Sequence, residues 1–102
     1  MATRLNILLV EPFYTGSHKK WADELKQFSS HNVEILSLSG HYWKWRMHGG
    51  AVSLAEKANK RYSTSNKPDL ILATDMLDLS LFMSLTRAWS HNIPTAIYFH
   101  EN

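Results

Sequence analysis

The sequence contains no cysteine. This absence excludes disulfide bonds and thiolate metal sites, and it leaves the redox compartment undecided. Long apolar runs are also missing, since no stretch approaches the roughly 20 residues of a membrane-spanning helix. The N-terminal residues up to the end of the first apolar run are too few for the core of a secretory signal peptide. We therefore expect a chain without a membrane partner, located in the cytoplasm.

The glycine-rich fingerprints of phosphate-binding loops are absent. Neither G-x-G-x-x-G nor G-x-x-x-x-G-K occurs, which disfavours a dinucleotide site or a P-loop. The pair Gly49-Gly50 permits a close backbone approach before a helix, but a lone glycine pair is not such a fingerprint. No H-E-x-x-H or similar spacing of ligands occurs either, so we expect no metal site.

The charge is small but unevenly distributed. The 102 residues are 44% hydrophobic and 20% charged, as in an ordinary soluble protein, and their length predicts one domain over residues 1–102. The net charge is +2, yet residues 41–67 carry six Lys or Arg against one acid. A basic segment mildly favours a polyanionic partner such as nucleic acid, although a solvated charged face is the commoner explanation.

The first elements are predicted from residues 5–21. The aliphatic run Ile7 to Val10 lacks polar alternation, which predicts a strand covered on both faces in a parallel sheet. Pro12 cannot continue a central strand, and Gly16 lets the backbone turn. Ser17 is the expected N-cap of a helix over about residues 18–29. The apolar positions of this helix are Trp21, Ala22, Leu25 and Phe28.

Two lysines, Lys19 and Lys20, fall in the first turn of this helix. The partial positive charge of a helix N-terminus disfavours cations there. A bound anion would reverse the sign, because the free N–H groups and the lysines would then converge on it. The alternative is that both side chains point into water.

The remaining pattern alternates strands with helices. Strands are predicted over residues 33–38, 69–74 and 95–99, and helices over 51–62 and from the cap Asp78 to about Asn92. The expected buried stripe of the last helix comprises Leu79, Phe82, Met83, Thr86 and Trp89. The order β-α-β-α-β-α-β predicts a three-layer, Rossmann-like α/β domain with four or more parallel strands joined by right-handed crossovers.

Unusual residues cluster where these strands end. In such a sheet, ligands bind outside the carboxyl ends of the strands. The segments that follow the four predicted strands are residues 11–18, 42–50, 75–76 and 100–102. The topology therefore places four distant segments on one edge of the sheet.

Several of these residues have chemistry suited to a ligand. The run Trp43-Lys44-Trp45-Arg46 combines aromatic faces with cations, as stacking on a base together with phosphate contact requires, or else its tryptophans fill the edge of the core. His18 and His100 could act as acid, base or sugar-hydroxyl partner, or be surface groups. Asp75 could bind a hydroxyl or satisfy amides in its turn. The expected turn histidines are His31, His41 and His91.

Three separated segments resemble one enzyme family. Residues 11–19 (EPFYTGSHK), 43–51 (WKWRMHGGA) and 98–102 (YFHEN) are similar, in the same order, to the N-terminal domain of tRNA-queuosine mannosyltransferases, also called glycosyltransferase-like domain-containing proteins. The resemblance extends over essentially the whole chain. It departs at Thr15, where the family commonly has a second glycine.

The resemblance implies half of a GT-B glycosyltransferase, in which two Rossmann-like domains face a cleft. The complete enzyme would transfer mannose from GDP-mannose to queuosine in tRNA with retention of anomeric configuration. It implies no cofactor beyond this sugar nucleotide. A C-terminal domain that binds most of the nucleotide would be a further partner, so the chain alone is expected to be inactive, as an excised domain or a truncated product.

The family motifs, together with the positions of Lys19 in the first helical turn and of Asp75 after its strand, imply roles for individual residues. The expected catalytic groups are His18, His100 and Glu101, and the expected contacts to the sugar nucleotide are Gly16, Ser17 and Lys19. The expected contacts to the tRNA acceptor are Trp43, Lys44, Trp45, Arg46, Asp75 and Asn102.

Two other classes of function remain open. A non-catalytic RNA-binding module would use the basic aromatic loop, and it would bind tRNA in a salt-sensitive way. A flavodoxin-like or receiver-type signalling domain fits the alternating pattern but lacks the acidic cluster that such domains use for metal.

Overall fold

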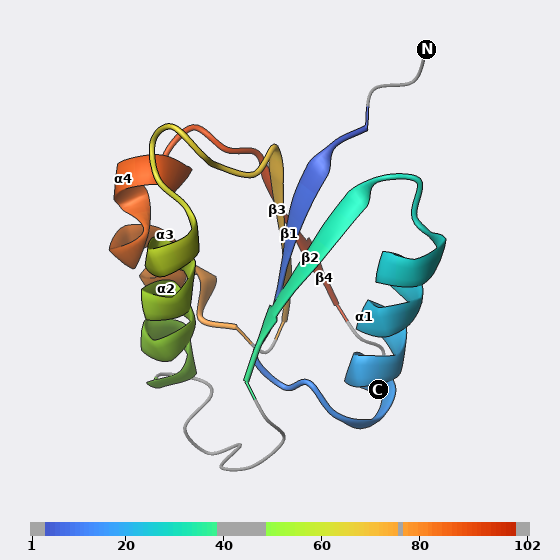
Figure 1. The fold of residues 1–102 in the computed structure, drawn as a ribbon. Coiled ribbons are helices and arrows are strands. Elements are labelled where there is room, and N and C mark those ends of the chain that lie inside the picture. The colour runs from blue at the N-terminus through green and yellow to red at the C-terminus, as the bar shows by residue number, and fades with distance from the viewer. Residues whose placement is uncertain (1–3, 39–48, 76, 100–102) are drawn as a thin grey trace.

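The computed structural model describes residues 4–38, 49–75 and 77–99. Within these ranges four strands form one parallel sheet in the order β2-β1-β3-β4 (Figure 1). The strands are β1 (Asn6–Glu11), β2 (Asn32–Ser37), β3 (Leu70–Thr74) and β4 (Thr95–Tyr98). The helices are α1 (Gly16–Phe28), α2 (Gly49–Arg61), α3 (Leu79–Leu85) and α4 (Arg87–Ser90). This arrangement confirms the expected Rossmann-like α/β fold.

The helices cover the sheet from both sides. Figure 1 shows α1 on one face and α2, α3 and α4 on the other, so the described chain has three layers. On the α1 side, Leu9 packs with Ala22 and Val33. On the opposite side, Leu8 and Val10 pack with residues of the other helices, including Leu54 and Phe82. Because alternate residues of β1 point to opposite faces, Leu9 belongs to one cluster and its neighbours Leu8 and Val10 belong to the other.

β1 is the central element of this core. Leu8, Leu9 and Val10 are fully buried, as the absence of polar alternation predicted. Val10 lies between Leu36 of β2 and Ala73 of β3 in the register of the sheet. The carboxyl ends of these three strands are therefore level, which brings the residues that follow them to one edge.

The start of α1 differs from the expectation. Ser17 is not the N-cap, because the helix already begins at Gly16 and Thr15 is its N-cap. Thr15 is extended, with φ −156° and ψ 161°, whereas Gly16 has a φ of 55°. This left-handed conformation is readily accessible to glycine and turns the extended chain into the helix two residues early. The last residue, Phe28, is 75% exposed and does not extend the buried face of Ala22.

The boundaries of α2 also differ, but its buried stripe is as expected. The helix begins at Gly49 rather than Ala51 and ends at Arg61. Four of the expected positions are almost completely buried, and Tyr62, just beyond the helix, is partly buried against them. The buried four are Ala51, Leu54, Ala55 and Ala58.

The last expected helix is two helices. Asp78 is the N-cap of α3 as predicted, and its Oδ1 accepts a hydrogen bond from the Leu81 N–H at 3.2 Å. The helix is interrupted at Thr86, which has φ −108° and ψ 10°. The Thr86 hydroxyl donates to the Phe82 carbonyl at 2.9 Å, and such local hydrogen bonds compete with regular helix geometry. Phe82, Thr86 and Trp89 are nevertheless buried, as the stripe predicted.

β4 is the last strand in the order of the sheet and is exposed along its whole length. It ends at Tyr98, one residue earlier than expected, and Phe99 is 69% exposed. The bounds of two other strands also differ by one residue from the prediction: β2 extends over Asn32–Ser37 instead of 33–38, and β3 begins at Leu70 instead of residue 69. Among the helices that the structure describes, none has the length and apolar content to cross a membrane.

Candidate functional site

The end of β1 lies beside the end of β3. Val10 and Ala73 are register partners, so the next residues, Glu11 and Thr74, are neighbours although 63 positions separate them. Both side chains are buried. The carboxyl edge of the sheet, where the topology predicts ligands, therefore contains an acid enclosed by protein.

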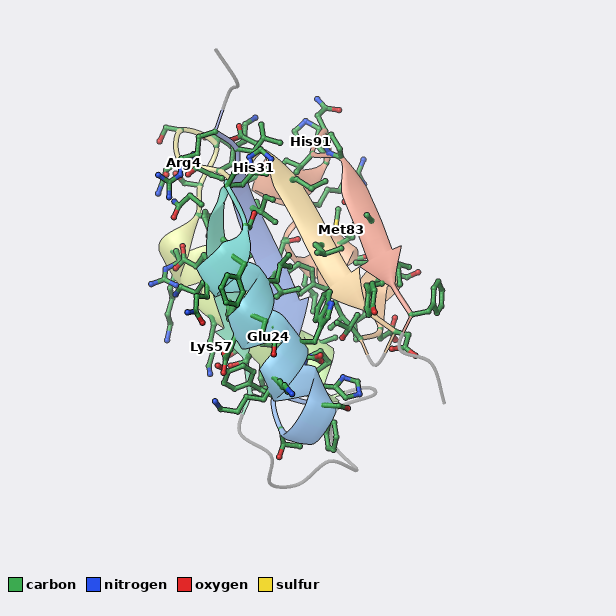
Figure 2. All side chains as sticks on the ribbon, turned by 90° about the vertical axis from the view of Figure 1, so that its right-hand side faces the viewer. Arg4, Glu24, His31, Lys57, Met83 and His91 are labelled. Atoms are coloured by element: carbon green, nitrogen blue, oxygen red, sulfur yellow. The ribbon has the colours of Figure 1, made fainter. Side chains whose placement is uncertain are left out.

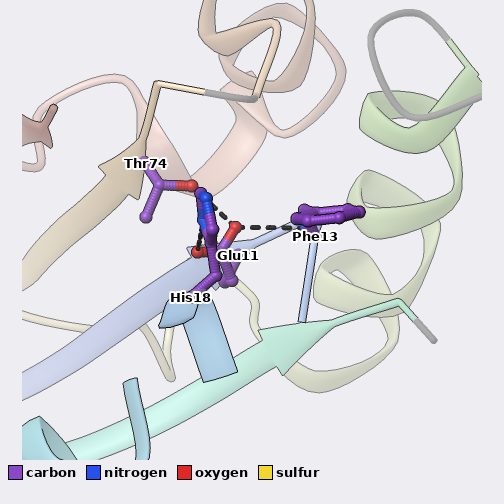
Figure 3. A network of polar contacts seen from close by, with 4 residues as sticks. All are labelled: Glu11, Phe13, His18 and Thr74. Carbon is purple, nitrogen blue, oxygen red and sulfur yellow. Dashed lines mark hydrogen bonds and ion pairs between the residues drawn. The ribbon is translucent and has the colours of Figure 1, made fainter. Parts of the chain in front are cut away.

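Glu11 is held by hydrogen bonds from several directions. Its Oε2 accepts from the Thr74 hydroxyl at 2.8 Å and from the Phe13 backbone N–H at 3.1 Å. Its Oε1 lies 2.9 Å from Nδ1 of His18 (Figure 3). The Glu11 side chain has no exposed surface, and a buried carboxyl group is tolerated only when such partners replace water.

His18 comes from the first turn of α1 and closes this cluster from the other side. Its side chain is 15% exposed, so the ring lies between the buried carboxylate and solvent. The Phe13 ring meets the imidazole edge to face, with centroids 5.3 Å apart and planes at 88°. Packing and the contact to Glu11 together fix the orientation of the ring.

This arrangement has the chemistry of an oriented imidazole. A histidine whose first nitrogen faces a carboxylate can use its second nitrogen to bind a ligand or transfer a proton. The catalytic role expected for His18 is therefore compatible with its position. Within the described residues, no three His, Cys, Asp or Glu side chains come together as potential metal ligands.

Gly16 and Ser17, expected to contact the donor, form the exposed start of α1. The Thr15 side chain makes no capping hydrogen bond there. The first N–H groups of a helix have no partners within the helix, and they attract anions. The start of α1 thus lies next to His18, and a helix start of this kind can attract an anion.

Lys19 is paired within the protein. Its Nζ donates to Oδ2 of Asp23 at 2.7 Å and lies 5.2 Å from the centre of the Tyr14 ring. The Tyr14 hydroxyl donates to the other oxygen of Asp23. The hydrogen bond to Asp23 raises the pKa of Lys19, and the same bond lowers the pKa of Asp23. An anion at the start of α1 would therefore compete with Asp23 for Lys19.

Asp75 lies at the carboxyl end of β3, next to this site. Its side chain is exposed, and its backbone N–H donates to the Tyr98 carbonyl at 3.2 Å. This places an acceptor-binding candidate on the expected edge of the sheet. The other expected acceptor and catalytic residues lie outside the described residues: Trp43, Lys44, Trp45, Arg46, His100, Glu101 and Asn102.

Two of the three turn histidines lie at the opposite edge of the sheet, near the amino ends of the strands (Figure 2). Nδ1 of His31 accepts a hydrogen bond from the Leu5 N–H at 3.0 Å, and Nδ1 of His91 lies 3.1 Å from the Arg87 carbonyl. Both are in turns, as predicted, whereas His41 lies outside the described residues. Their distance from Glu11 in the fold makes them useful controls for His18.

A polar pocket of about 330 Å³ also lies at that opposite edge. Its wall includes Asn6 and Asn32, which begin β1 and β2. Glu34, in the same wall, forms an ion pair with Arg61 and accepts a hydrogen bond from the Tyr62 hydroxyl at 3.0 Å. The acid in this wall, Glu34, is thus paired within the protein, and the pocket lies away from the carboxyl edge where the topology predicts ligands.

The sequence assigned no role to Glu11 or Thr74. A signal for Glu11 was present, because a charged residue directly continues an apolar run that predicts a buried strand. Thr74 gave no comparable signal, since threonine is common in strands. Only the register of β1 and β3 reveals that the two form one hydrogen-bonded unit.

Comparison with known proteins gives this geometry a context. Residues 6–102 match the family described as the N-terminal part of tRNA-queuosine alpha-mannosyltransferase. The tRNA-queuosine alpha-mannosyltransferase of Drosophila melanogaster is 32% identical over 98 residues, which cover 95% of this chain and 25% of the fly protein. The chain thus spans about a quarter of the length of this curated relative. No solved structure matched it. The chain belongs to the family of N-terminal domains of tRNA-queuosine alpha-mannosyltransferases.

Proposed function

We propose that this domain is the acceptor-side, N-terminal part of a retaining glycosyltransferase that transfers mannose from GDP-mannose to queuosine in tRNA. Membership of the family and the named fly relative support the enzyme class and the acceptor. The donor, the stereochemistry and the GT-B cleft follow from the resemblance of the sequence motifs. A C-terminal domain in the parent enzyme would bind most of the nucleotide.

The observation that carries the proposal is the pairing of His18 with the buried Glu11 at the carboxyl edge of the sheet. In the transfer, the bond between the anomeric carbon and the diphosphate breaks, and GDP departs with the electron pair. The anomeric carbon bonds to a hydroxyl oxygen of the queuosine diol, and the proton of that hydroxyl passes to a phosphate oxygen of the departing GDP. Such a reaction needs groups that hold sugar hydroxyls and the departing phosphate, and an oriented imidazole suits this task.

The neighbouring residues have complementary roles in this proposal. The backbone at Gly16 and Ser17 would contact the diphosphate, because helix N–H groups bind anions. Lys19 would add its charge after leaving Asp23, and exposed ion pairs of this kind are weak enough to exchange. Asp75 would accept a hydrogen bond from a hydroxyl of the acceptor.

The proposal is tested with the full-length enzyme that carries this domain. Labelled GDP-mannose is incubated with tRNA that contains queuosine and with the same tRNA lacking it. We expect mannose transfer to the first substrate only. Absence of transfer, together with tight and salt-sensitive binding of tRNA, would favour the non-catalytic RNA-binding module instead.

The site assignment is tested by substituting histidines. His18→Ala is expected to reduce transfer by about tenfold or more, since positioned acid–base groups contribute roughly 10²–10⁴-fold. His91→Ala is the matched control, because His91 is an exposed histidine at the opposite edge. Equal activity of the two variants would refute the assignment of His18. Trp45→Ala tests the expected acceptor contact in the same assay.

A further inference from the structure

We propose that Glu11 is a positioning residue that accepts the Nδ1 proton of His18 and thereby presents Nε2 of the ring to the substrate. The kinetic part of this inference rests on the function proposed above, in which His18 acts on the sugar nucleotide or its acceptor. The structural part concerns only which ring nitrogen carries a proton.

The two oxygens of Glu11 have separate tasks. Oε2 is anchored to β3 through the Thr74 hydroxyl and to its own loop through the Phe13 N–H. Oε1 is directed to Nδ1 of His18. Rotating the carboxylate would break the two anchoring hydrogen bonds inside a fully buried environment, so its orientation is fixed.

This fixed acceptor decides the protonation pattern of the imidazole. A carboxylate accepts hydrogen bonds and cannot donate them, so the nitrogen that faces it has to carry the proton. Nδ1 is 2.9 Å from Oε1, and it is therefore the donor. A neutral ring then has its lone pair on Nε2, and a charged ring has its second proton there. In both states a substrate of the proposed reaction would meet Nε2 rather than Nδ1, which faces Glu11.

Stability alone gives a poor reason for a carboxylate at this position. Burying a charged group costs free energy that its partners often fail to recover in full, and an apolar side chain of similar size is frequently as stable. Glu11 has no exposed surface and lies directly after the apolar core residues of β1. A role in orienting a functional group explains why the core ends in an acid at the edge where ligands bind.

The substitution Glu11→Gln gives a sharp test because it preserves size and reverses one hydrogen bond. The Phe13 N–H can only donate, so the glutamine carbonyl must occupy the position of Oε2. The amide NH₂ then faces His18, and Nδ1 has to accept instead of donate. The ring proton should consequently move from Nδ1 to Nε2.

The test uses the full-length enzyme with ¹⁵N-labelled histidine at about pH 8.5, above the usual range of imidazole titration. Ring nitrogen shifts report protonation of each atom, and His18→Gln identifies the signals of His18. We expect Nδ1 of His18 to be protonated in the unsubstituted enzyme and unprotonated in Glu11→Gln. An unprotonated Nδ1 in the unsubstituted enzyme would overturn the proposal, even if the variant does not fold.

Kinetics provide the second readout. Glu11→Gln is expected to lower kcat by about tenfold or more with a much smaller change in KM, because a misdirected imidazole still leaves the other binding contacts. Thr74→Val should retain the protonated Nδ1 and have a smaller effect, since the Phe13 N–H still anchors Oε2. Glu34→Gln, the same chemical change at the opposite edge, should leave kcat unaltered.

The outcomes separate the two proposals. If the unsubstituted enzyme transfers no mannose, the proposed function fails, while the nitrogen shifts still test the contact of Glu11 with His18. If transfer occurs but Glu11→Gln retains its kcat or its Nδ1 proton, only the positioning role of Glu11 is refuted.

Discussion

The indole ring of Trp21 stacks on the phenol ring of Tyr98, with centroids 4.3 Å apart and planes at 14°. The contact joins α1 to β4, the strand at the exposed end of the sheet. Such aromatic pairs contribute about 0.5–1.5 kcal/mol beyond the area that they bury. Because Tyr98 is 41% exposed, we expect a value near the lower limit.

A double-mutant cycle of Trp21→Ala and Tyr98→Ala tests this contact. The two substitutions should lower the free energy of unfolding with a coupling of about 0.5 kcal/mol, measured by urea denaturation. Phe28→Ala is the control, because Phe28 is an aromatic residue of the same helix that is 75% exposed. Its effect should stay within about 0.5 kcal/mol. Strict additivity of the first two substitutions would show that the rings do not stabilise each other.

The N-cap of α3 gives a second prediction. Asp78→Ala removes the carboxylate that accepts from the Leu81 N–H, and it should reduce the free energy of unfolding by about 1 kcal/mol. Asp78→Asn should retain most of the stability, since asparagine is a comparable cap. Asp75→Ala serves as a control, because it also removes one carboxylate, three residues earlier and at an exposed position. Equal losses for Asp75→Ala and Asp78→Ala in urea denaturation would contradict a specific cap.

Tyr62 predicts a loss of stability at alkaline pH. Burial raises the pKa of the Tyr62 hydroxyl well above its usual value near 10, and the hydrogen bond to Glu34 raises it further. The folded protein thus retains the Tyr62 proton at a pH where the unfolded chain has lost it. The contribution of the protonated Tyr62 hydroxyl to the free energy of unfolding is therefore complete below about pH 10. It declines as the pH rises above about this value.

Tyr62→Phe isolates this effect. The variant should be less stable than the unsubstituted protein at neutral pH, because Glu34 loses a donor, but its free energy of unfolding should fall less steeply above about pH 10. Urea denaturation between about pH 8 and 11 measures both slopes. Identical slopes would mean that Tyr62 does not cause the alkaline loss. Tyr14, whose pKa is also raised through its hydrogen bond to Asp23, contributes to the slope that remains.

The parts of the fold that were predictable are those set by local pattern. The apolar run of β1 predicted burial on both faces, and the spacing of Ala51, Leu54 and Ala58 predicted the buried stripe of α2. The start of α1 was missed because a left-handed glycine moved the turn ahead of Ser17. The break between α3 and α4 was missed because it depends on how the buried hydroxyl of Thr86 is satisfied.

The alternating α/β pattern could be predicted from the sequence, and so could the edge of the sheet on which Glu11, His18 and Asp75 lie, because apolar periodicity and chain order are local properties. The sequence by itself did not determine the partners of these residues. Glu11 meets Thr74 only because β1 and β3 pair in a particular register, and it meets His18 only because Gly16 turns α1 back over the strand. Tertiary structure alone decided that a buried acid orients the histidine, since burial and hydrogen bonding depend on neighbours that are distant in the sequence.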